Sequence, residues 1–359
     1  MSAAAWLGAA LLWLVIIDVG VILHEGVHLL VARAQGAAVK TFSLGMGPVL
    51  LRRQLGGTEW RLSAFPVGGY VEIDGMAQPP GEPPRGFSRL PLLGKLATLL
   101  AAPLSNLALG VLLLAAVFMG QGVVTATHAD QAEIYRVLPG SAASHSGLEA
   151  GDRISAIDGR PLPKSGSGYL ALGRAIKAGG TIQLTLLPPG RSRPEQLAVH
   201  WTPHGHALFG VSYGPATITR KPGILRALAL ALGRTTSLLP AATSSLLHGV
   251  ASVIARPLRP SKQVVGPIGS VQLVGRSVQQ GGLWGFFEIA YLINLSLGLF
   301  NLLPIPGLDG GRALLVLLRA LIGRRFKSTL EDAVNLVGFA FLILFMALVV
   351  VSDVVRVSR

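Results

Sequence analysis

Cysteine is absent from the 359 residues of this chain. A disulfide framework is therefore excluded, and a metal site would have to use histidine and carboxylate ligands instead of thiolates. Charged residues are also scarce, at 13%, whereas 51% of the residues are hydrophobic. This composition excludes an ordinary soluble globular protein and predicts an integral membrane protein with room for one soluble module.

Acidic residues are few, with 17 Asp and Glu against 31 Lys and Arg, so the formal net charge is +14. A nucleic acid would suit this charge, but the basic residues are scattered between hydrophobic segments and aromatic residues make up only 6%. Anionic lipid head groups are therefore the expected partners, and no nucleic acid is expected.

The first hydrophobic run, residues 3–30, contains three ionisable residues that a membrane segment normally lacks. His24, Glu25 and His28 form the pattern HExxH. On a helix the two histidines lie one turn apart on the same face, so both imidazoles can bind one cation while Glu25 acts as a general base. A purely structural pair is the alternative, but burying three such groups costs free energy that a structural role would not repay.

We predict a polytopic α-helical membrane protein with about four transmembrane helices, a membrane-associated β-hairpin or small sheet, and one inserted extracytoplasmic module. A further membrane span is the alternative to a surface amphipathic helix within residues 222–256. The predicted segments are 1–34 (first transmembrane helix), 35–90 (cytoplasmic loop with the hairpin and a Pro/Gly linker), 91–119 (second transmembrane helix), 120–216 (module), 217–282 (amphipathic helices and connector), 283–312 (third transmembrane helix), 313–331 (cytoplasmic basic loop) and 332–359 (fourth transmembrane helix and C-terminus).

The orientation follows from the basic residues, none of which precedes Arg33 while many lie in residues 33–95. By the positive-inside rule this loop is cytoplasmic, and both termini and the module are extracytoplasmic. A second basic group, from Arg312 to Lys327, places the end of the third helix on the cytoplasmic side as well. The HExxH motif is expected toward that side of the bilayer.

A second motif, NLLPIPGLDGG at residues 301–311, ends the third helix with two prolines and places Asp309 between glycines. At matching depth, His24, His28 and Asp309 would supply the three protein ligands of a catalytic zinc ion. A simple helix cap is the alternative role for Asp309. Asn301 is a candidate for a hydrogen bond to the developing oxyanion or to the substrate backbone.

Two further polar or glycine-rich stretches are candidates for supporting the site. Asn106, inside the second membrane helix, either lies near the site or simply joins neighbouring helices. The runs at residues 41–53 and 58–73 predict a hairpin or small sheet, which either offers an edge at Gly68 and Gly69 to an extended peptide or merely packs.

The polar segment 139–159, PGSAASHSGLEAGDRISAIDG, resembles a PDZ domain through its Ser-Gly-Leu, its Gly-Asp-x-Ile and its closing Asp-Gly turn. PDZ domains bind extended peptides by strand addition, so peptide ligands are possible partners. His145, His204 and His206 share no ligand spacing and are expected at the surface.

Together, HEGVH, one PDZ-like module and NLLPIPGLDGG resemble the site-2 protease family of intramembrane zinc metalloproteases, specifically its bacterial RseP-type members. Residues 102–106, APLSN, resemble the family's Gly-Pro-x-x-Asn with Ala102 in place of glycine, and residues 265–270, VGPIGS, also match. The sequence departs from the enterobacterial members of this type in one respect: it has a single PDZ-like module where they have two.

The resemblance implies His24, His28 and Asp309 as zinc ligands, Glu25 as the base and Asn301 as a substrate or transition-state contact. Pro304 and Gly310 would support the site. It also implies a stress-response zinc metalloendopeptidase of the bacterial inner membrane, acting on single-span membrane proteins such as anti-sigma factors or signal-peptide remnants. In such a scheme another protease first trims the outer domain, and the PDZ module acts as a size filter.

Two hypotheses from other classes remain. A catalytically inactive membrane scaffold would use the PDZ-like module to recruit partners, and a transporter would explain ionisable residues inside the membrane. One clustered site and a soluble module argue against a conduction path. Glu25 favours the enzyme, because a structural zinc site needs no base.

Overall fold

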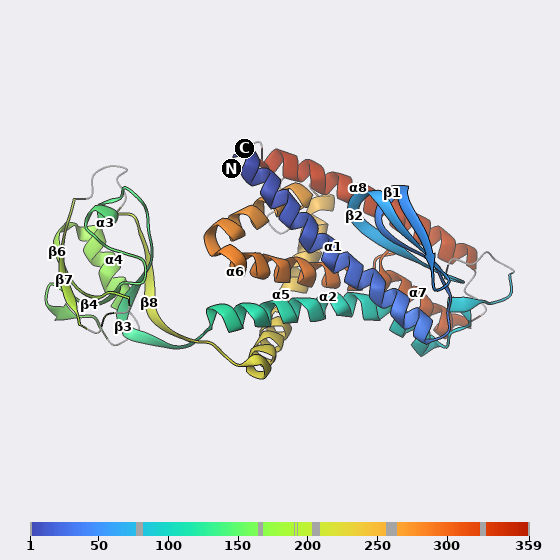
Figure 1. Cartoon of the computed structure of the whole chain (residues 1–359), viewed down its shortest axis with the longest axis horizontal. Helices are drawn as coiled ribbons and strands as arrows, with labels where there is room; N and C mark the ends of the chain where they lie inside the picture. The colour runs from blue at the N-terminus through green and yellow to red at the C-terminus, as the bar shows by residue number, and fades with distance from the viewer. Residues whose placement is uncertain are drawn as a thin grey trace. The chain divides into compact units, whose positions relative to one another are not determined.

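The computed structural model describes residues 2–76, 82–163, 168–189, 191, 193–202, 209–255, 264–323 and 328–357. His204, His206, residues 77–81 of the predicted linker and residues 324–327 of the predicted basic loop lie outside the described residues. The chain divides into two compact units, Met1–Gly120 together with Gly223–Arg359, and Gln121–Pro222 (Figure 1).

Among its described residues, the first unit contains five helical segments that are long and apolar enough to cross a membrane. At about 1.5 Å per residue, the 32 residues of the first helix extend well beyond a hydrocarbon core of roughly 30 Å. The protein is thus a multi-pass helical membrane protein with five candidate spans, where about four were predicted. They are α1 (Ala3–Ala34), α2 (Leu92–Gln121), α5 (Ile224–Ala255), α6 (Pro267–Leu302) and, within α8 (Ser328–Val357), Leu336–Val355.

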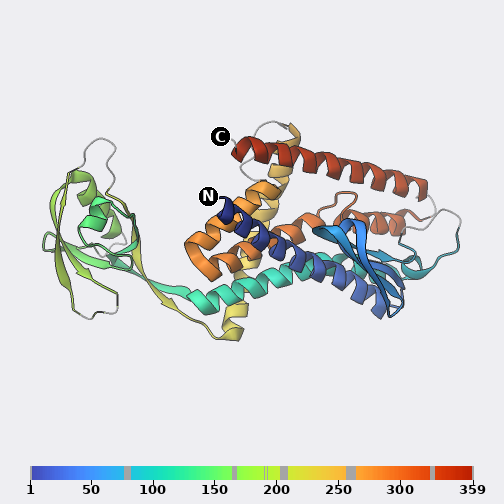
Figure 2. The same cartoon turned by 45° about the horizontal axis from the view of Figure 1, so that its top comes forward.

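The additional candidate is α5, which is a single helix that continues through Pro240. It crosses α2 and α6 steeply in both views instead of running beside them (Figures 1 and 2). Ala227 and Ala231 pack in a cluster with residues of α2 and α6, and Val253 packs with residues of α8. A helix that lies along the membrane would cross the spans in this way, and that placement stays a prediction.

Helix α6 folds back on itself at Gly282, whose backbone is non-helical with φ 56° and ψ −135°. A Cβ on Gly285 would lie 2.0 Å from the carbonyl oxygen of Ser277, although residues eight apart in a straight helix are about 12 Å apart. Only residues 283–302 correspond to the predicted third span. Asp309 begins a separate helix, α7 (Asp309–Ile322), whose residues 313–322 were predicted as loop.

A long hairpin, β1 (Val39–Leu55) and β2 (Thr58–Ile73), follows α1 and turns at two glycines, Gly56 and Gly57, with positive φ. Residues 41–44 of β1 pair both with residues 59–62 and with residues 69–72 of β2, so they lie between the two halves of β2. The short 3₁₀ helix η1 (Gly86–Arg89) then leads to α2. Many apolar side chains of the hairpin are exposed, which suits a membrane surface: Met46, Val49, Leu50, Leu51, Leu55, Phe65 and Val67.

The inserted unit is a sheet in the order β7-β6-β4-β3-β8, with β5 paired to β4 and a closely packed apolar core. Its last strand extends to residue 220, beyond the predicted module end at 216. Val123 pairs with Arg220, so the unit begins and ends on neighbouring strands. Its elements are β3 (Val123–Val137), α3 (Ala142–His145), β4 (Arg153–Ile157), β5 (Arg160–Pro161), α4 (Gly168–Ala178), β6 (Gly180–Leu187), β7 (Glu195–Trp201) and β8 (Val211–Arg220).

Candidate metal centre

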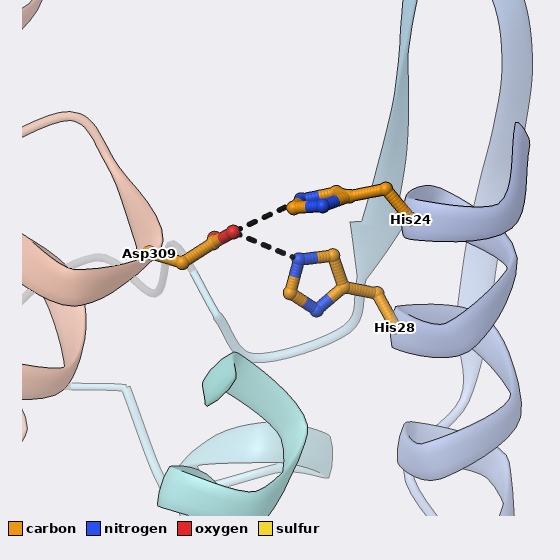
Figure 3. A group of neighbouring side chains, drawn as sticks. All are labelled: His24, His28 and Asp309. Atoms are coloured by element: carbon orange, nitrogen blue, oxygen red, sulfur yellow. Dashed lines mark hydrogen bonds and ion pairs between the residues drawn. The ribbon is translucent and has the colours of Figure 1, made fainter. Parts of the chain in front are cut away.

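The two histidines of HExxH lie on one face of α1, as their spacing predicts. His24 and His28 are 7% and 5% exposed, and their ring centroids are 5.0 Å apart. The Nε2 atom of His24 lies 3.0 Å from Oδ2 of Asp309, and the Nε2 atom of His28 lies 3.3 Å from the same oxygen (Figure 3). The structure therefore brings together two motifs that are about 280 residues apart in sequence.

Asp309 is the first residue of α7, and the preceding Leu308 occupies the N-cap without a side-chain hydrogen bond. The Asp309 carboxylate points at the histidines (Figure 3), so it is more than a simple helix cap. The two following glycines make this placement possible. A Cβ on Gly310 would lie 2.3 Å from the carbonyl oxygen of Leu302, and one on Gly311 would lie 2.0 Å from that of Ile305.

The donor set fits zinc, because it combines two imidazole nitrogens and one carboxylate oxygen that all lie within 4.8 Å of one another. A tetrahedral zinc ion with ligands at about 2.0–2.2 Å separates any two ligand atoms by roughly 3.4 Å. The nitrogen-to-oxygen distances of 3.0 and 3.3 Å are close to that separation. Three protein ligands leave a fourth position open, as in catalytic zinc sites.

Helix α2 contacts the other ring nitrogen of each histidine. The Nδ1 atom of His28 lies 2.8 Å from the carbonyl oxygen of Thr98, and that of His24 lies 3.4 Å from Nδ2 of Asn106. Gln35 donates a hydrogen bond to Oγ1 of Thr98 and so joins the end of α1 to α2. The Asn106 side chain thus lies beside His24, and this contact between α2 and α1 fits both roles that the sequence left open for it. Sequence reasoning missed Thr98, whose backbone carbonyl leaves no signature in a sequence.

Glu25 is half-buried on α1 and lies beside Gly69 of β2. A Cβ on Gly69 would lie 3.7 Å from Cγ of Glu25, 3.1 Å from Cγ1 of Val21 and 2.7 Å from the carbonyl oxygen of Ser43. Glycine thus lets this strand lie directly against the HExxH helix. The neighbouring Gly68 has a φ of +82° and marks the bend just before this contact.

Asn301 and Pro304 are not brought to the metal ligands by any hydrogen bond in the described part of the chain. The Asn301 amide donates to the carbonyl oxygen of Leu297 in its own helix, at 3.1 Å. Pro304 is exposed in the loop between α6 and α7. Their suggested roles toward substrate remain predictions.

Comparison with known proteins identifies relatives along nearly the whole chain. The model of Peptidase family M50 matches residues 12–345. A protein of Clostridium acetobutylicum named as a candidate zinc metalloprotease is 29% identical over 93% of this chain and 94% of its own length. The membrane metalloprotease ARASP, a chloroplastic protein of Arabidopsis thaliana, is 26% identical over 93% of this chain and 76% of its own length.

The family match covers both motifs whose side chains meet at the candidate centre, HExxH on α1 and the aspartate that begins α7. His24 and His28 lie within the candidate span α1, and Asp309 begins α7 seven residues after the end of the candidate span α6. The chain belongs to Peptidase family M50, the site-2 protease family, and is a membrane-embedded zinc metalloprotease.

Proposed function

We propose that this protein hydrolyses peptide bonds within or near the transmembrane segments of single-span membrane proteins. The observation that carries the proposal is the buried cluster of His24, His28 and Asp309, with Glu25 beside it on a candidate membrane helix. Substrates of this kind include anti-sigma factors and signal-peptide remnants, which would place the enzyme in a bacterial stress response. In its single inserted module it differs from the enterobacterial RseP type.

The residues divide into ligands and a base. His24, His28 and Asp309 hold the zinc ion, which when bound lowers the pKa of a water molecule and polarises the substrate carbonyl. Glu25 accepts a proton from the attacking water and passes it to the leaving amine. Asn301 is the candidate for holding the substrate backbone or the developing oxyanion.

A substrate helix must become extended before its carbonyl can be attacked, because a helix keeps its amides in internal hydrogen bonds. Residues 69–73 of β2 pair with β1 along one edge only, and no described strand pairs with the other edge. We assign this edge, which starts at Gly69 beside Glu25, to hold the extended segment by strand addition.

We further propose that the inserted unit is a PDZ domain that restricts access by substrate size. Its strand β8 lies at one edge of the sheet and packs against α4, which leaves an edge for strand addition by a peptide. The basic residues between 33 and 95 support an orientation in which that loop and the zinc site face the cytoplasm and both termini and the inserted unit are outside. Anionic lipids would contact this basic loop.

Cleavage of a reporter tests the proposal. The reporter is a single-span protein with a short outer segment, incubated in detergent with wild-type enzyme or with Glu25→Gln. We expect cleavage by wild type alone and its loss when a zinc chelator is added, because Glu25→Gln removes the base but none of the ligands. Bound zinc is measured in both proteins as the control.

Equal cleavage by Glu25→Gln would contradict the assigned role of Glu25. An inactive wild type that binds zinc fully would favour the inactive scaffold, in which the inserted unit recruits partners.

A further inference from the structure

We propose that Asn106 is a positioning residue that sets which ring nitrogen of His24 carries the proton, and thereby tunes zinc affinity. The inference rests on the proposed role of His24 as a zinc ligand. Asn106 is fully buried in α2, and its Nδ2 lies 3.4 Å from Nδ1 of His24. Its Oδ1 is buried without a hydrogen-bond partner within the described part of the chain.

The observed contacts define one protonation pattern for a neutral His24. An amide Nδ2 can only donate, so Nδ1 of His24 accepts and the ring proton sits on Nε2. Nε2–H then donates to Oδ2 of Asp309 across 3.0 Å. In this pattern both ring nitrogens of His24 have a hydrogen-bond partner, but Oδ1 of Asn106 has none among the described residues.

Metal binding requires the opposite pattern. A zinc ion takes the lone pair of Nε2, so the single proton of the neutral ring must lie on Nδ1. Nδ1–H would then face the Nδ2 donor of Asn106. Rotation of the Asn106 amide presents Oδ1 to Nδ1–H instead, which both orients the ligand and pairs the buried oxygen.

The Nδ1 atom of His28 also has a partner on α2, but this partner can act only as an acceptor. Its Nδ1 lies 2.8 Å from the carbonyl oxygen of Thr98, and a carbonyl can only accept. Nδ1 of His28 therefore carries the proton, and Nε2 is already prepared for a metal. Both partners belong to α2, eight residues apart, so one helix orients both imidazoles. Asparagine suits His24 because it donates in one pattern and accepts in the other.

Simple packing between membrane helices is the competing role for Asn106, and the chain offers a matched control. Asn294 on α6 is also a buried membrane-helix asparagine, and its Oδ1 also has no partner among the described residues. Its amide donates to Ala290 in its own helix, and its side chain packs on Gly20 of α1. It contacts neither histidine by a described hydrogen bond.

Zinc affinity separates the two roles. We would measure it by competition with a chromophoric chelator for the full-length protein and for Asn106→Ala, Asn106→Asp and Asn294→Ala in detergent. Loss of an outer partner of a zinc-bound histidine costs roughly 10- to 100-fold in affinity. We expect that loss for Asn106→Ala, near wild-type affinity for Asn106→Asp, which keeps an acceptor, and no change for Asn294→Ala.

Equal zinc affinities for Asn106→Ala and Asn294→Ala would overturn the proposal and leave packing as the role. An Asn106→Asp protein as weak as Asn106→Ala would overturn the acceptor assignment. The measurement uses no substrate, so its outcome is independent of whether the reporter is cleaved.

A second test needs only wild-type protein and so does not depend on whether a variant folds. Nitrogen-15 spectra of labelled histidines distinguish a protonated from an unprotonated ring nitrogen. We expect the proton of His24 to move from Nε2 to Nδ1 when zinc is added, while His28 keeps its proton on Nδ1. An unchanged His24 would contradict the switch.

Discussion

At the scale of single residues, Gly310 decides where Asp309 sits. A Cβ at this position would lie 2.3 Å from the carbonyl oxygen of Leu302 and 2.5 Å from that of Leu303, and backbone cannot easily move aside. We expect Gly310→Ala to displace the start of α7 and to lower cleavage roughly 100-fold, the cost of misplacing a catalytic group by about 1 Å. Bound zinc should fall too, because Asp309 is a proposed ligand.

The control is Gly233→Ala on α5, where no atom lies within 4 Å of the added Cβ. It should keep zinc and activity. Full zinc binding and full cleavage by Gly310→Ala would show that the α6–α7 loop relaxes around a methyl group, and would contradict the tight packing described here.

The sequence was enough to predict the three residues of the candidate metal site, because their signals are local. HExxH fixes His24 and His28 on one helical face, and the prolines and glycines around Asp309 mark a helix break that only a site tolerates. Thr98 could not be predicted, since it acts through a backbone carbonyl. The contact of Asn106 with His24 could not be predicted either, because the sequence does not give the distance between their side chains.

At the scale of elements, Asp353 of α8 holds the beginning of α6. Its fully buried carboxylate accepts hydrogen bonds from the backbone N–H groups of Gly266, at 3.1 Å, and Gly269, at 2.8 Å. Such groups have no partner within the helix itself. We expect Asp353→Ala to lower the free energy of unfolding by about 1–3 kcal/mol, because buried donors lose their acceptor.

Unfolding in detergent, followed by circular dichroism, measures this change. Asp353→Asn should lower the free energy of unfolding by less than Asp353→Ala, since its amide oxygen can still accept a hydrogen bond. Glu288→Ala, on the exposed surface of α6, should change the free energy of unfolding little. An Asp353→Ala protein as stable as Glu288→Ala would mean that other groups satisfy the two amides.

The predicted segments and the observed helices differ most where the chain reverses direction. The predicted second span at 91–119 nearly coincides with α2, Leu92–Gln121. The reversal at Gly282 escaped prediction, because the close contact between Gly285 and Ser277 depends on backbone angles at one glycine. Residues 313–322 form part of α7, although their basic residues predict a cytoplasmic loop.

At the scale of the whole molecule, the inserted unit joins the membrane unit through two adjacent strands. Val123 pairs with Arg220, and a Cβ on Gly122 would lie 3.2 Å from the Arg220 carbonyl oxygen. Paired residues in an antiparallel ladder lie about 4.5–5.5 Å apart, so a short glycine-serine linker can replace residues 123–220. We expect the shortened protein to fold and to bind zinc, because all three proposed ligands belong to the membrane unit.

Its substrate range tests the proposed size filter. Reporters with a short outer segment should be cleaved by the shortened protein at a rate close to that of wild type. Reporters with a folded outer domain should be cleaved by the shortened protein alone, since the restriction lies in the unit that was removed. Glu25→Gln in the shortened protein controls for contaminating proteases. Continued rejection of the large reporters would place the size limit in the membrane unit itself, and loss of zinc would show that the two units stabilise each other.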